Sequence, residues 1–216
     1  HRLGKDRLKS YQIACILGVE PLTLILKGEG KLDEDGNPTD RQKVLQADFL
    51  AGQVLRAIQR FCQSADREIA AKHLQYIQGI DRTEKHQDRD GPTYQVHGTA
   101  NNNLVQDYLL PFCEKAWKDL NSIDGQLPFS HDVYVKIWQL GTGENRPFIS
   151  ADYLLVDEAQ DTAPVFLDVI RQQTHMLLIL VGDSNQAIYE WRGAVDAMKS
   201  FPEATRRLLT QSYRFG

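Results

Sequence analysis

The chain has 216 residues, 42% of them hydrophobic, which is enough material for one or two small cores. Its formal net charge of −4 argues against a broad basic surface for nucleic acid, so any DNA would be held by a local groove, by base stacking or by other parts of the molecule. No apolar run reaches the roughly 18 residues that span a bilayer, and three scattered cysteines without C-x-x-C spacing argue against a disulfide framework or a metal site and fit a reducing compartment.

The first quarter of the sequence predicts two helices separated by a hairpin. Residues 11–19 indicate a short helix that Gly18 helps to end. The β-branched and apolar run 22–27 and the segment 41–45 flank a stretch rich in Asp, Gly and Pro, which predicts a β-hairpin. Across residues 47–61 the apolar side chains recur at helical spacing, so a longer helix should follow.

The middle of the chain gives more uneven signals. Ser64-Ala65-Asp66 predicts another helix start, because it combines cap residues with an acidic first turn. Residues 81–100 are polar and contain Gly-Pro, which indicates a loop. Residues 103–120 predict a helix, and Ser130 is placed to cap another helix that runs to Leu140.

The pattern of apolar residues changes near residue 150. Residues 153–156 and 176–181 are continuous apolar runs, and residues 165–173 between them predict a helix. Strand, helix and strand with fully apolar strands is typical of a parallel sheet that is buried on both faces. The predicted fold class is therefore α/β, with parallel strands and helices after residue 150 and a mainly helical subdomain with a hairpin before it.

Two acidic residues follow the first of these strands, at the sheet edge where ligands of α/β proteins gather. Nucleotide hydrolases use such a strand end to place one carboxylate near Mg²⁺ and another near the attacking water. Asp157 and Glu158 stand in these positions, in the run D-E-A-Q-D. The alternative is a solvated acidic turn, which the four preceding apolar residues disfavour.

A second group of polar and aromatic residues follows the next strand, in the run 182–194. Gln186 comes just past the strand end, where its amide would reach a phosphate or its bound water. Stacking of a base on an aromatic ring contributes roughly 1–3 kcal/mol whatever the base. The aromatic and basic residues of the run would serve that purpose: Tyr189, Trp191 and Arg192. At the end of the chain, Arg214 would present a guanidinium to a γ-phosphate, although taken alone it is more typical of a surface arginine.

The runs D-E-A-Q-D, G-D-S-N-Q-A-I-Y-E-W-R-G-A and L-T-Q-S-Y-R-F-G occur in this order, and together they resemble helicase motifs II, III and IV of superfamily 1A. That group contains the UvrD, Rep and PcrA proteins. The last run and the segments 60–66 and 131–140 are most similar to the branch of the F-box DNA helicases and their bacterial relatives. The resemblance implies that residues 151–216 form part of a RecA-like P-loop NTPase motor domain, 1A. Residues 1–150 would be the helical 1B insertion of that fold, with an approximate boundary.

The resemblance also implies a role for each matched residue. Asp157 would hold Mg²⁺, Glu158 would polarise the attacking water, and Gln186 would sense the γ-phosphate of ATP and couple it to DNA. Arg214 would contact that phosphate when the two motor lobes close. The contacts to single-stranded DNA would come from the aromatic and basic group: Tyr189, Trp191 and Arg192. The implied protein is an intracellular ATP-dependent DNA helicase of repair or recombination, cytoplasmic in a bacterium or nuclear in a eukaryote, that moves 3′ to 5′ and binds single-stranded DNA and its junctions with duplex.

One departure from the family limits these expectations. The chain contains no G-x-x-x-x-G-K-[ST] run, and the nearest glycines, Gly28 to Lys31, have the wrong spacing and no following Ser or Thr. We therefore expect a fragment that begins after the phosphate loop and ends where the second motor lobe starts, with negligible ATPase activity of its own. The alternative is a non-catalytic module that binds DNA or a partner and has lost the phosphate loop.

Two interpretations of residues 1–150 stay open: a packed subdomain without chemistry of its own, or a guide for DNA or a dock for a partner. The cations near the predicted hairpin permit the second: Lys27, Lys31, Arg41 and Lys43. The histidines of this region lie among polar residues, which predicts solvated side chains and not metal ligands: His73, His86 and His97.

Overall fold

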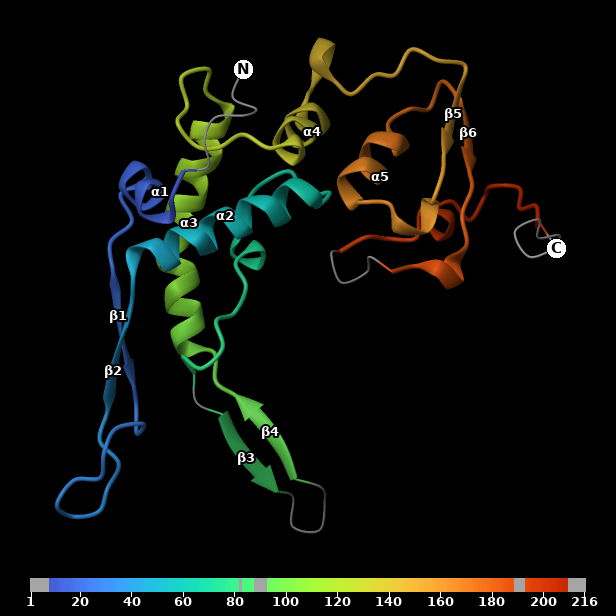
Figure 1. The fold of residues 1–216 in the computed structure, drawn as a ribbon. Coiled ribbons are helices and arrows are strands. Elements are labelled where there is room, and N and C mark those ends of the chain that lie inside the picture. The colour runs from blue at the N-terminus through green and yellow to red at the C-terminus, as the bar shows by residue number, and fades with distance from the viewer. Residues whose placement is uncertain (1–7, 82, 88–92, 189–192, 210–216) are drawn as a thin grey trace.

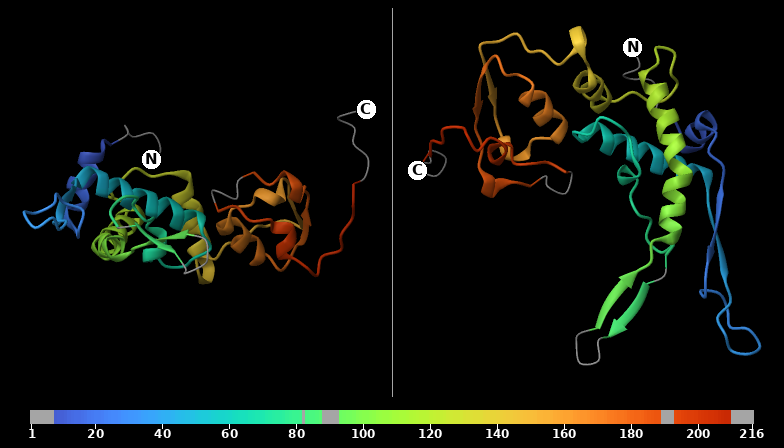
Figure 2. Two further views of the ribbon diagram at one scale, coloured as in Figure 1. Left: turned by 90° about the horizontal axis from the view of Figure 1, so that it is seen from below. Right: turned by 180° about the vertical axis from the view of Figure 1, so that it is seen from behind.

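The computed structural model describes residues 8–81, 83–87, 93–188 and 193–209 of the chain (Figure 1). A helical body carries two hairpins that project from it in the same general direction, and a smaller α/β unit lies on another side of this body (Figures 1 and 2). In the described parts, none of the helices is long and apolar enough to cross a membrane.

The elements predicted for the first quarter of the chain are confirmed. Helix α1 spans Ser10–Leu17 and ends at Gly18, whose φ of 73° lets its N–H donate back to helix carbonyls. Strands β1 (Leu22–Leu26) and β2 (Arg41–Leu45) pair antiparallel as the expected hairpin. Helix α2 (Ala47–Gln63) follows directly and forms the centre of the helical body.

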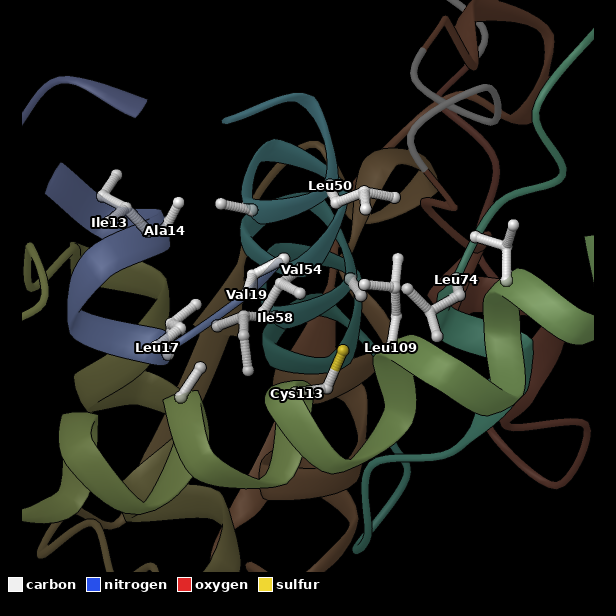
Figure 3. Packing of buried hydrophobic residues seen from close by; sticks show 14 of the residues in the cluster. Ile13, Ala14, Leu17, Val19, Leu50, Val54, Ile58, Leu74, Leu109 and Cys113 are labelled. Carbon is white, nitrogen blue, oxygen red and sulfur yellow. The ribbon is translucent and has the colours of Figure 1, made fainter. Parts of the chain in front are cut away.

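The core of the helical body lies where α2 packs against α1 and the long helix α3 (Ala100–Asn121). The helix predicted at residues 103–120 is therefore confirmed, and it is slightly longer than expected. Apolar side chains recur along α2 at intervals of three and four residues, so they form one face that is removed from water. The buried side chains that meet there include Leu17, Leu50, Val54, Ile58, Leu109 and Cys113 (Figure 3).

The helix start predicted at Ser64-Ala65-Asp66 is wrong, because this segment ends α2. Ser64 is the C-cap residue of α2, with extended backbone angles, and its hydroxyl donates to the Phe61 carbonyl. The same hydroxyl accepts the backbone N–H of Asp66, which turns the chain away from the helix axis. The residues that favour a helix N-cap also favour turns, and only a short 3₁₀ turn at Ala71–His73 follows.

The loop predicted for residues 81–100 is also wrong. Strands β3 (Thr83–Gln87) and β4 (Thr93–His97) pair antiparallel as a second hairpin. Strand β3 has no apolar residue, and in β4 only Tyr94 and Val96 alternate with polar residues, which is too short a pattern to predict a strand pair. The base of the hairpin is fixed by the Asp81 carboxylate, which accepts the Asn102 side-chain amide at 2.7 Å and its backbone N–H at 2.9 Å.

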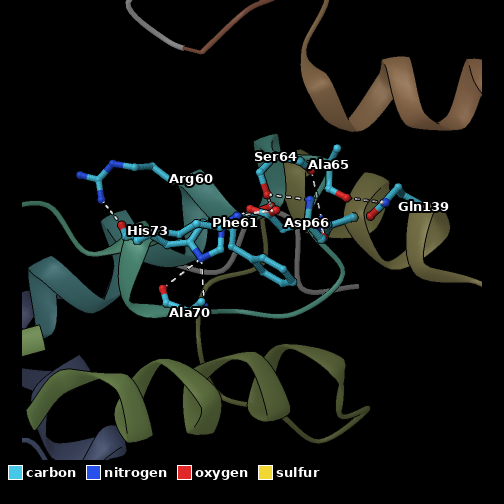
Figure 4. A network of polar contacts seen from close by, with 10 residues as sticks. Arg60, Phe61, Ser64, Ala65, Asp66, Ala70, His73 and Gln139 are labelled. Atoms are coloured by element: carbon cyan, nitrogen blue, oxygen red, sulfur yellow. Dashed lines mark hydrogen bonds and ion pairs between the residues drawn. The ribbon is translucent and has the colours of Figure 1, made fainter. Parts of the chain in front are cut away.

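His73 is buried, with 4% of its surface exposed, which corrects the prediction of a solvated histidine. Its Nε2 lies 2.9 Å from Asp66 Oδ2, and its carbonyl accepts the Arg60 guanidinium (Figure 4). Its ring meets the edge of the Phe61 ring at 5.4 Å between centroids. His86 and His97 fall in β3 and β4, and their side chains lie outside the described part of the chain.

The strand–helix–strand unit predicted after residue 150 is confirmed. Strand β5 (Tyr153–Val156) and strand β6 (Leu177–Leu180) pair in parallel, with Val156 opposite Leu180. Helix α5 (Pro164–Arg171) connects them, and Pro164 occupies its first turn, where the missing N–H costs nothing. The carboxyl ends of both strands therefore open onto one edge of the sheet.

The prediction that this sheet is buried on both faces is wrong for the chain as it stands. Val156 and Leu180 pack against Leu167 of α5, so one face is covered. The residues of the other face alternate with these, and 64% of Tyr153 and 65% of Leu177 are exposed. The apolar residues of both strands predict burial, but no described element of this chain covers that face.

Helix α4 (His131–Leu140) is confirmed at its predicted position after Ser130, and it joins the two parts of the molecule. It packs against both α2 and α5. Its Gln139 is fully buried and donates to Asp168 Oδ2 of α5 at 2.7 Å. The segment from α4 to β5 contains the predicted domain boundary near residue 150, which stays a prediction.

Candidate functional site

The predicted Mg²⁺ ligand Asp157 and the predicted catalytic acid Glu158 follow β5 directly, and both are exposed at the sheet edge. Glu158 has φ 50° and ψ 41°, and among the described residues it alone combines a positive φ with a side chain. A non-glycine residue in this left-handed region is strained by about 1–2 kcal/mol. Such strain persists only where the surrounding contacts hold the residue in place, and it gathers at functional sites.

The carboxylates at the end of β5 offer the kind of ligand that Mg²⁺ takes. This ion is usually bound by one or two carboxylates, and its shell is completed by water and phosphate oxygens. Asp157 and Glu158 are exposed, and the Asp157 Oδ1 accepts the Glu158 backbone N–H at 2.9 Å. In the described part of the chain no group of three or more His, Cys, Asp or Glu residues is arranged to hold a metal. The two exposed carboxylates at the end of β5 are of the ligand type that this ion takes.

Gln160 connects this strand end to the next one. It lies in the 3₁₀ turn Ala159–Asp161 and is 2% exposed. Its Nε2 donates to Glu158 Oε2 at 2.7 Å, and its Oε1 accepts the backbone N–H of Asp183 at 3.0 Å. A Cβ at Gly182 would collide with Gln160 Oε1, so this glycine makes room for the bridge.

Gln186 lies on the same edge as the acids, in the 3₁₀ turn Ser184–Gln186 that follows β6. Its Nε2 donates to Asp183 Oδ2 at 2.9 Å. The backbone N–H of Asn185 and then this amide hold the pKa of the Asp183 carboxyl below its usual value. Contacts therefore run from Glu158 through Gln160 and Asp183 to Gln186, as the prediction of neighbouring strand ends requires.

The loop between residues 188 and 195 is attached at both ends to the turn that carries Gln160. The Ile188 backbone N–H donates to Asp161 Oδ1 at 3.1 Å, and the Val195 N–H donates to the Thr162 carbonyl at 2.8 Å. The predicted DNA-contacting residues of this loop lie outside the described residues, as does the predicted γ-phosphate ligand, so all four stay predictions: Tyr189, Trp191, Arg192 and Arg214.

Sequence reasoning assigned no role to Gln160, Asp161 or Asp183, although all three lie within the motifs. The contacts of Gln160 with Asp183 and of Asp161 with Ile188 join residues 23 and 27 positions apart, so spacing alone gave no signal. The only hint was position: each lies within a few residues of the carboxyl end of a strand in a parallel pair.

Two of the four cations near the first hairpin make contacts within the described chain. Arg41 pairs with Glu29 at 3.2 Å, and Lys43 donates to the Gly79 carbonyl at 2.9 Å. The glycines before Lys31 make hairpin contacts, because the Gly28 N–H donates to the Asp40 carboxylate. These contacts favour a structural role for the segment and give it no resemblance to a phosphate-binding loop.

Comparison with known proteins adds an independent result. The family model of the UvrD/REP helicase N-terminal domain matches residues 32–203, which span both the helical body and the α/β unit. No solved structure matches the chain.

Three relatives illustrate the similarity. F-box DNA helicase 1 of Gallus gallus is 39% identical over 48% of this chain and 10% of its own length. F-box DNA helicase protein 1 of Schizosaccharomyces pombe is 28% identical over 79% of the chain and 17% of its own length. ATP-dependent DNA helicase PcrA of Bacillus subtilis is 41% identical over 29% of the chain and 9% of its own length. The chain thus spans less than a fifth of each of these relatives.

Proposed function

This chain belongs to the UvrD/REP helicase N-terminal domain family, and on that premise we propose that it supplies part of the ATP site of a DNA-translocating motor. The motor couples ATP hydrolysis to movement on single-stranded DNA, 3′ to 5′, in repair or recombination. It acts where the DNA of the cell lies, in the cytoplasm of a bacterium or the nucleus of a eukaryote. Its DNA substrates include single strands and their junctions with duplex.

The observation that carries the proposal is the shared edge of β5 and β6. Glu158, which follows β5, would accept a proton from the attacking water, and its neighbour Asp157 would bind Mg²⁺. A bound Mg²⁺ would offset the charge on the phosphate oxygens. Gln186 would exchange its contact with Asp183 for one with the γ-phosphate, and Arg214 would approach from the closing lobe.

The proposed DNA contacts come from the loop that Asp161 and Thr162 attach to the acidic turn. Trp191 and Tyr189 would stack on bases, and Arg192 would contact the phosphate backbone. This attachment gives the nucleotide site a direct mechanical route to the DNA surface, because a shift of the turn moves both ends of the loop.

The remaining half of the nucleotide site is proposed to come from other parts of the motor. The 216 residues contain no phosphate-binding loop with the spacing G-x-x-x-x-G-K-[ST]. The backbone N–H groups and the lysine of such a loop provide most of the phosphate contacts in this class of enzyme. The 216-residue chain on its own should therefore bind ATP poorly and hydrolyse none.

The decisive experiment is Glu158→Gln in the protein encoded by the complete reading frame. Loss of a general base typically lowers kcat by about 10²–10⁴-fold, while the isosteric amide should leave nucleotide binding within about threefold. Steady-state ATPase assays with saturating oligo-dT and binding of a fluorescent ATP analogue measure the two quantities. The matched control is Glu144→Gln, an exposed glutamate in the segment before β5, which should leave both unchanged.

Undiminished turnover in Glu158→Gln would remove the proposed role of this carboxylate. The competing function is a non-catalytic module that binds DNA or a partner, and the missing phosphate loop favours it. That function predicts oligo-dT binding without ATP hydrolysis in the complete protein, and no phosphate-loop sequence in the same reading frame.

A further inference from the structure

We propose that Gln160 is a positioning residue for Glu158, and that it couples this carboxylate to the strand end that carries Gln186. The inference rests on the proposed function and deepens it. It assigns a role to a residue that neither the sequence motifs nor the comparisons assign.

The conformation of Glu158 needs an external constraint. With φ at 50° the residue is in a region that side chains disfavour, and its carboxylate is exposed to solvent. An exposed carboxylate samples several rotamers unless a partner holds it. Fixing one of these rotamers in the productive geometry then costs side-chain entropy. The described partner of this carboxylate is Gln160 Nε2, at 2.7 Å from Oε2.

Gln160 is itself fixed at both ends of its amide. The nitrogen donates to Glu158, and the oxygen accepts the Asp183 N–H at 3.0 Å. The side chain is almost fully buried, so neither contact competes freely with water. The neighbouring backbone is shaped for it, because a Cβ at Gly182 would collide with Gln160 Oε1.

The bridge extends to the loop that bears the proposed DNA contacts. Asp183 holds the Gln186 side-chain amide at 2.9 Å on one side of the turn. On the other side, Asp161 and Thr162 hold the backbone at the two ends of the loop. A displacement of Gln160 would therefore be transmitted to the water-polarising carboxylate, to Gln186 and to the loop together.

A second buried glutamine provides a matched control. Gln173 is 6% exposed, and its Nε2 donates to the carbonyls of Pro147 and Val169. Its Oε1 accepts the Ile149 N–H at 2.9 Å. Gln173 thus resembles Gln160 in size, in burial and in having both ends of its amide hydrogen-bonded, but its partners lie at the amino-terminal side of the sheet, away from the acids.

The kinetic experiment compares Gln160→Met with Gln173→Met in the complete protein. Methionine keeps the volume of glutamine and removes its polar atoms. With saturating oligo-dT, Gln160→Met should lower kcat for ATP at least about tenfold and change the KM for ATP less than about threefold, since positioning and not nucleotide binding is lost. Gln173→Met should keep kcat within about twofold of the wild type. Equal losses in both variants, or wild-type kcat in Gln160→Met, would overturn the proposal.

Gln160→Glu separates the two halves of the bridge and serves if the methionine variant fails to fold. It keeps an acceptor for the Asp183 N–H but presents a carboxylate to Glu158, so kcat should fall while the Asp183 contact survives. Amide hydrogen exchange in the 216-residue chain reports that contact without ATP. The Asp183 amide should exchange at least about tenfold faster in Gln160→Met than in the wild type and should be unchanged in Gln173→Met.

The two measurements distinguish the possible failures. If the wild-type complete protein does not hydrolyse ATP, but the Asp183 amide still depends on Gln160, the proposed function fails and the bridge stands. If ATP is hydrolysed and the Asp183 amide exchanges equally fast in the wild type and in Gln160→Met, the bridge is absent and the role of Gln160 is refuted.

Discussion

The helical body and the α/β unit differ in how they bury apolar surface. In the helical body, large side chains such as Phe61, Leu50 and Leu109 are removed from water by helices of the same chain. In the α/β unit, buried apolar side chains such as Leu167, Val169 and Ala197 lie on one side of the sheet, and the other face of the sheet is exposed. The two regions therefore differ in how far their apolar residues are covered within this chain.

This difference bears on the candidate site, which lies in the less packed of the two regions. Its geometry depends on polar contacts of the turn after β5, such as those of Gln160, more than on a surrounding core. Under the proposed function, the exposed sheet face is where further elements would add packing. The helical body, in contrast, should be stable largely through contacts that are already present.

The largest expected effect tests the packing of the helical body. Phe61→Ala removes a fully buried ring that meets the Trp117 ring at 5.1 Å between centroids and lies 4.3 Å from Lys136 Nζ. Truncations of this kind typically cost about 3–5 kcal/mol of unfolding free energy. Urea unfolding followed by far-UV circular dichroism measures it. Phe49→Ala on the same helix, where 38% of the side chain is exposed, should cost less than half as much.

Equal losses in these two variants would show that the helical body is loosely packed in solution. The comparison with the α/β unit would then disappear, because neither region would have a well-ordered core. A transition whose midpoint changes without a change in slope would support the interpretation that only stability is altered.

A smaller effect is expected from Lys136, which ties the helical body to the segment after α2. This lysine is fully buried, and it donates to the carbonyls of Ser64 and Asp66. Burial lowers its pKa from 10.5 to about 8, against the opposing attraction of Cys62, Asp66 and Asp168, with a further lowering from Arg67. The ionised lysine is thus disfavoured in the folded state.

The sign of the pH dependence follows from this pKa. Between about pH 8 and 10.5 the unfolded chain binds more protons at Lys136 than the folded chain, so this residue makes stability rise with pH. Above pH 9 the thiols of Cys62 and Cys113 oppose the rise, because burial raises the pKa of each to about 12 and only the unfolded thiols ionise.

Subtracting the unfolding free energies of Lys136→Met from those of the wild type removes the contribution of Cys113 and leaves that of the lysine together with its attraction to Cys62. Since one pKa unit corresponds to about 1.4 kcal/mol, the difference should grow by about 1–3 kcal/mol in favour of the wild type from pH 7.5 to 10.5. Urea titrations at several pH values provide the data. A difference that is flat or falls with pH would show that the ammonium is solvated in the folded protein.

The elements that the sequence predicts correctly are those with a periodic or continuous apolar pattern. Helix α2 and strands β5 and β6 were predictable, because apolar periodicity or continuity determines them locally. The hairpin of β3 and β4 was not, since its pairing depends on backbone hydrogen bonds between polar segments.

At the candidate site, the positions of the acids and of Gln186 followed from the strand ends. The bridge through Gln160 was not predictable, since it depends on which side chain reaches a backbone N–H on the neighbouring strand. Nor does an apolar strand reveal whether the layer that should cover it is provided by the same segment of chain. The exposed face of β5 and β6 is the result.

The smallest expected effect concerns that exposed face. Leu177 is 65% exposed on β6, so Leu177→Lys should change the unfolding free energy of the 216-residue chain by less than about 1 kcal/mol. The added charge should also reduce binding of the dye ANS, which reports exposed apolar surface. The matched control is Leu167→Lys on the covered side, where 6% of the leucine is exposed and an unpaired charge would cost several times more.

The same substitution in the complete protein tests whether further elements cover the exposed face of β5 and β6. If additional elements cover β5 and β6 there, Leu177→Lys should destabilise the complete protein by at least about 2–3 kcal/mol, because a charge would be buried without a partner. A loss of that size already in the 216-residue chain would mean that the face is covered within this chain. A negligible loss in both proteins would mean that the sheet ends as a two-stranded, half-exposed unit, and that the site is held by its polar contacts alone.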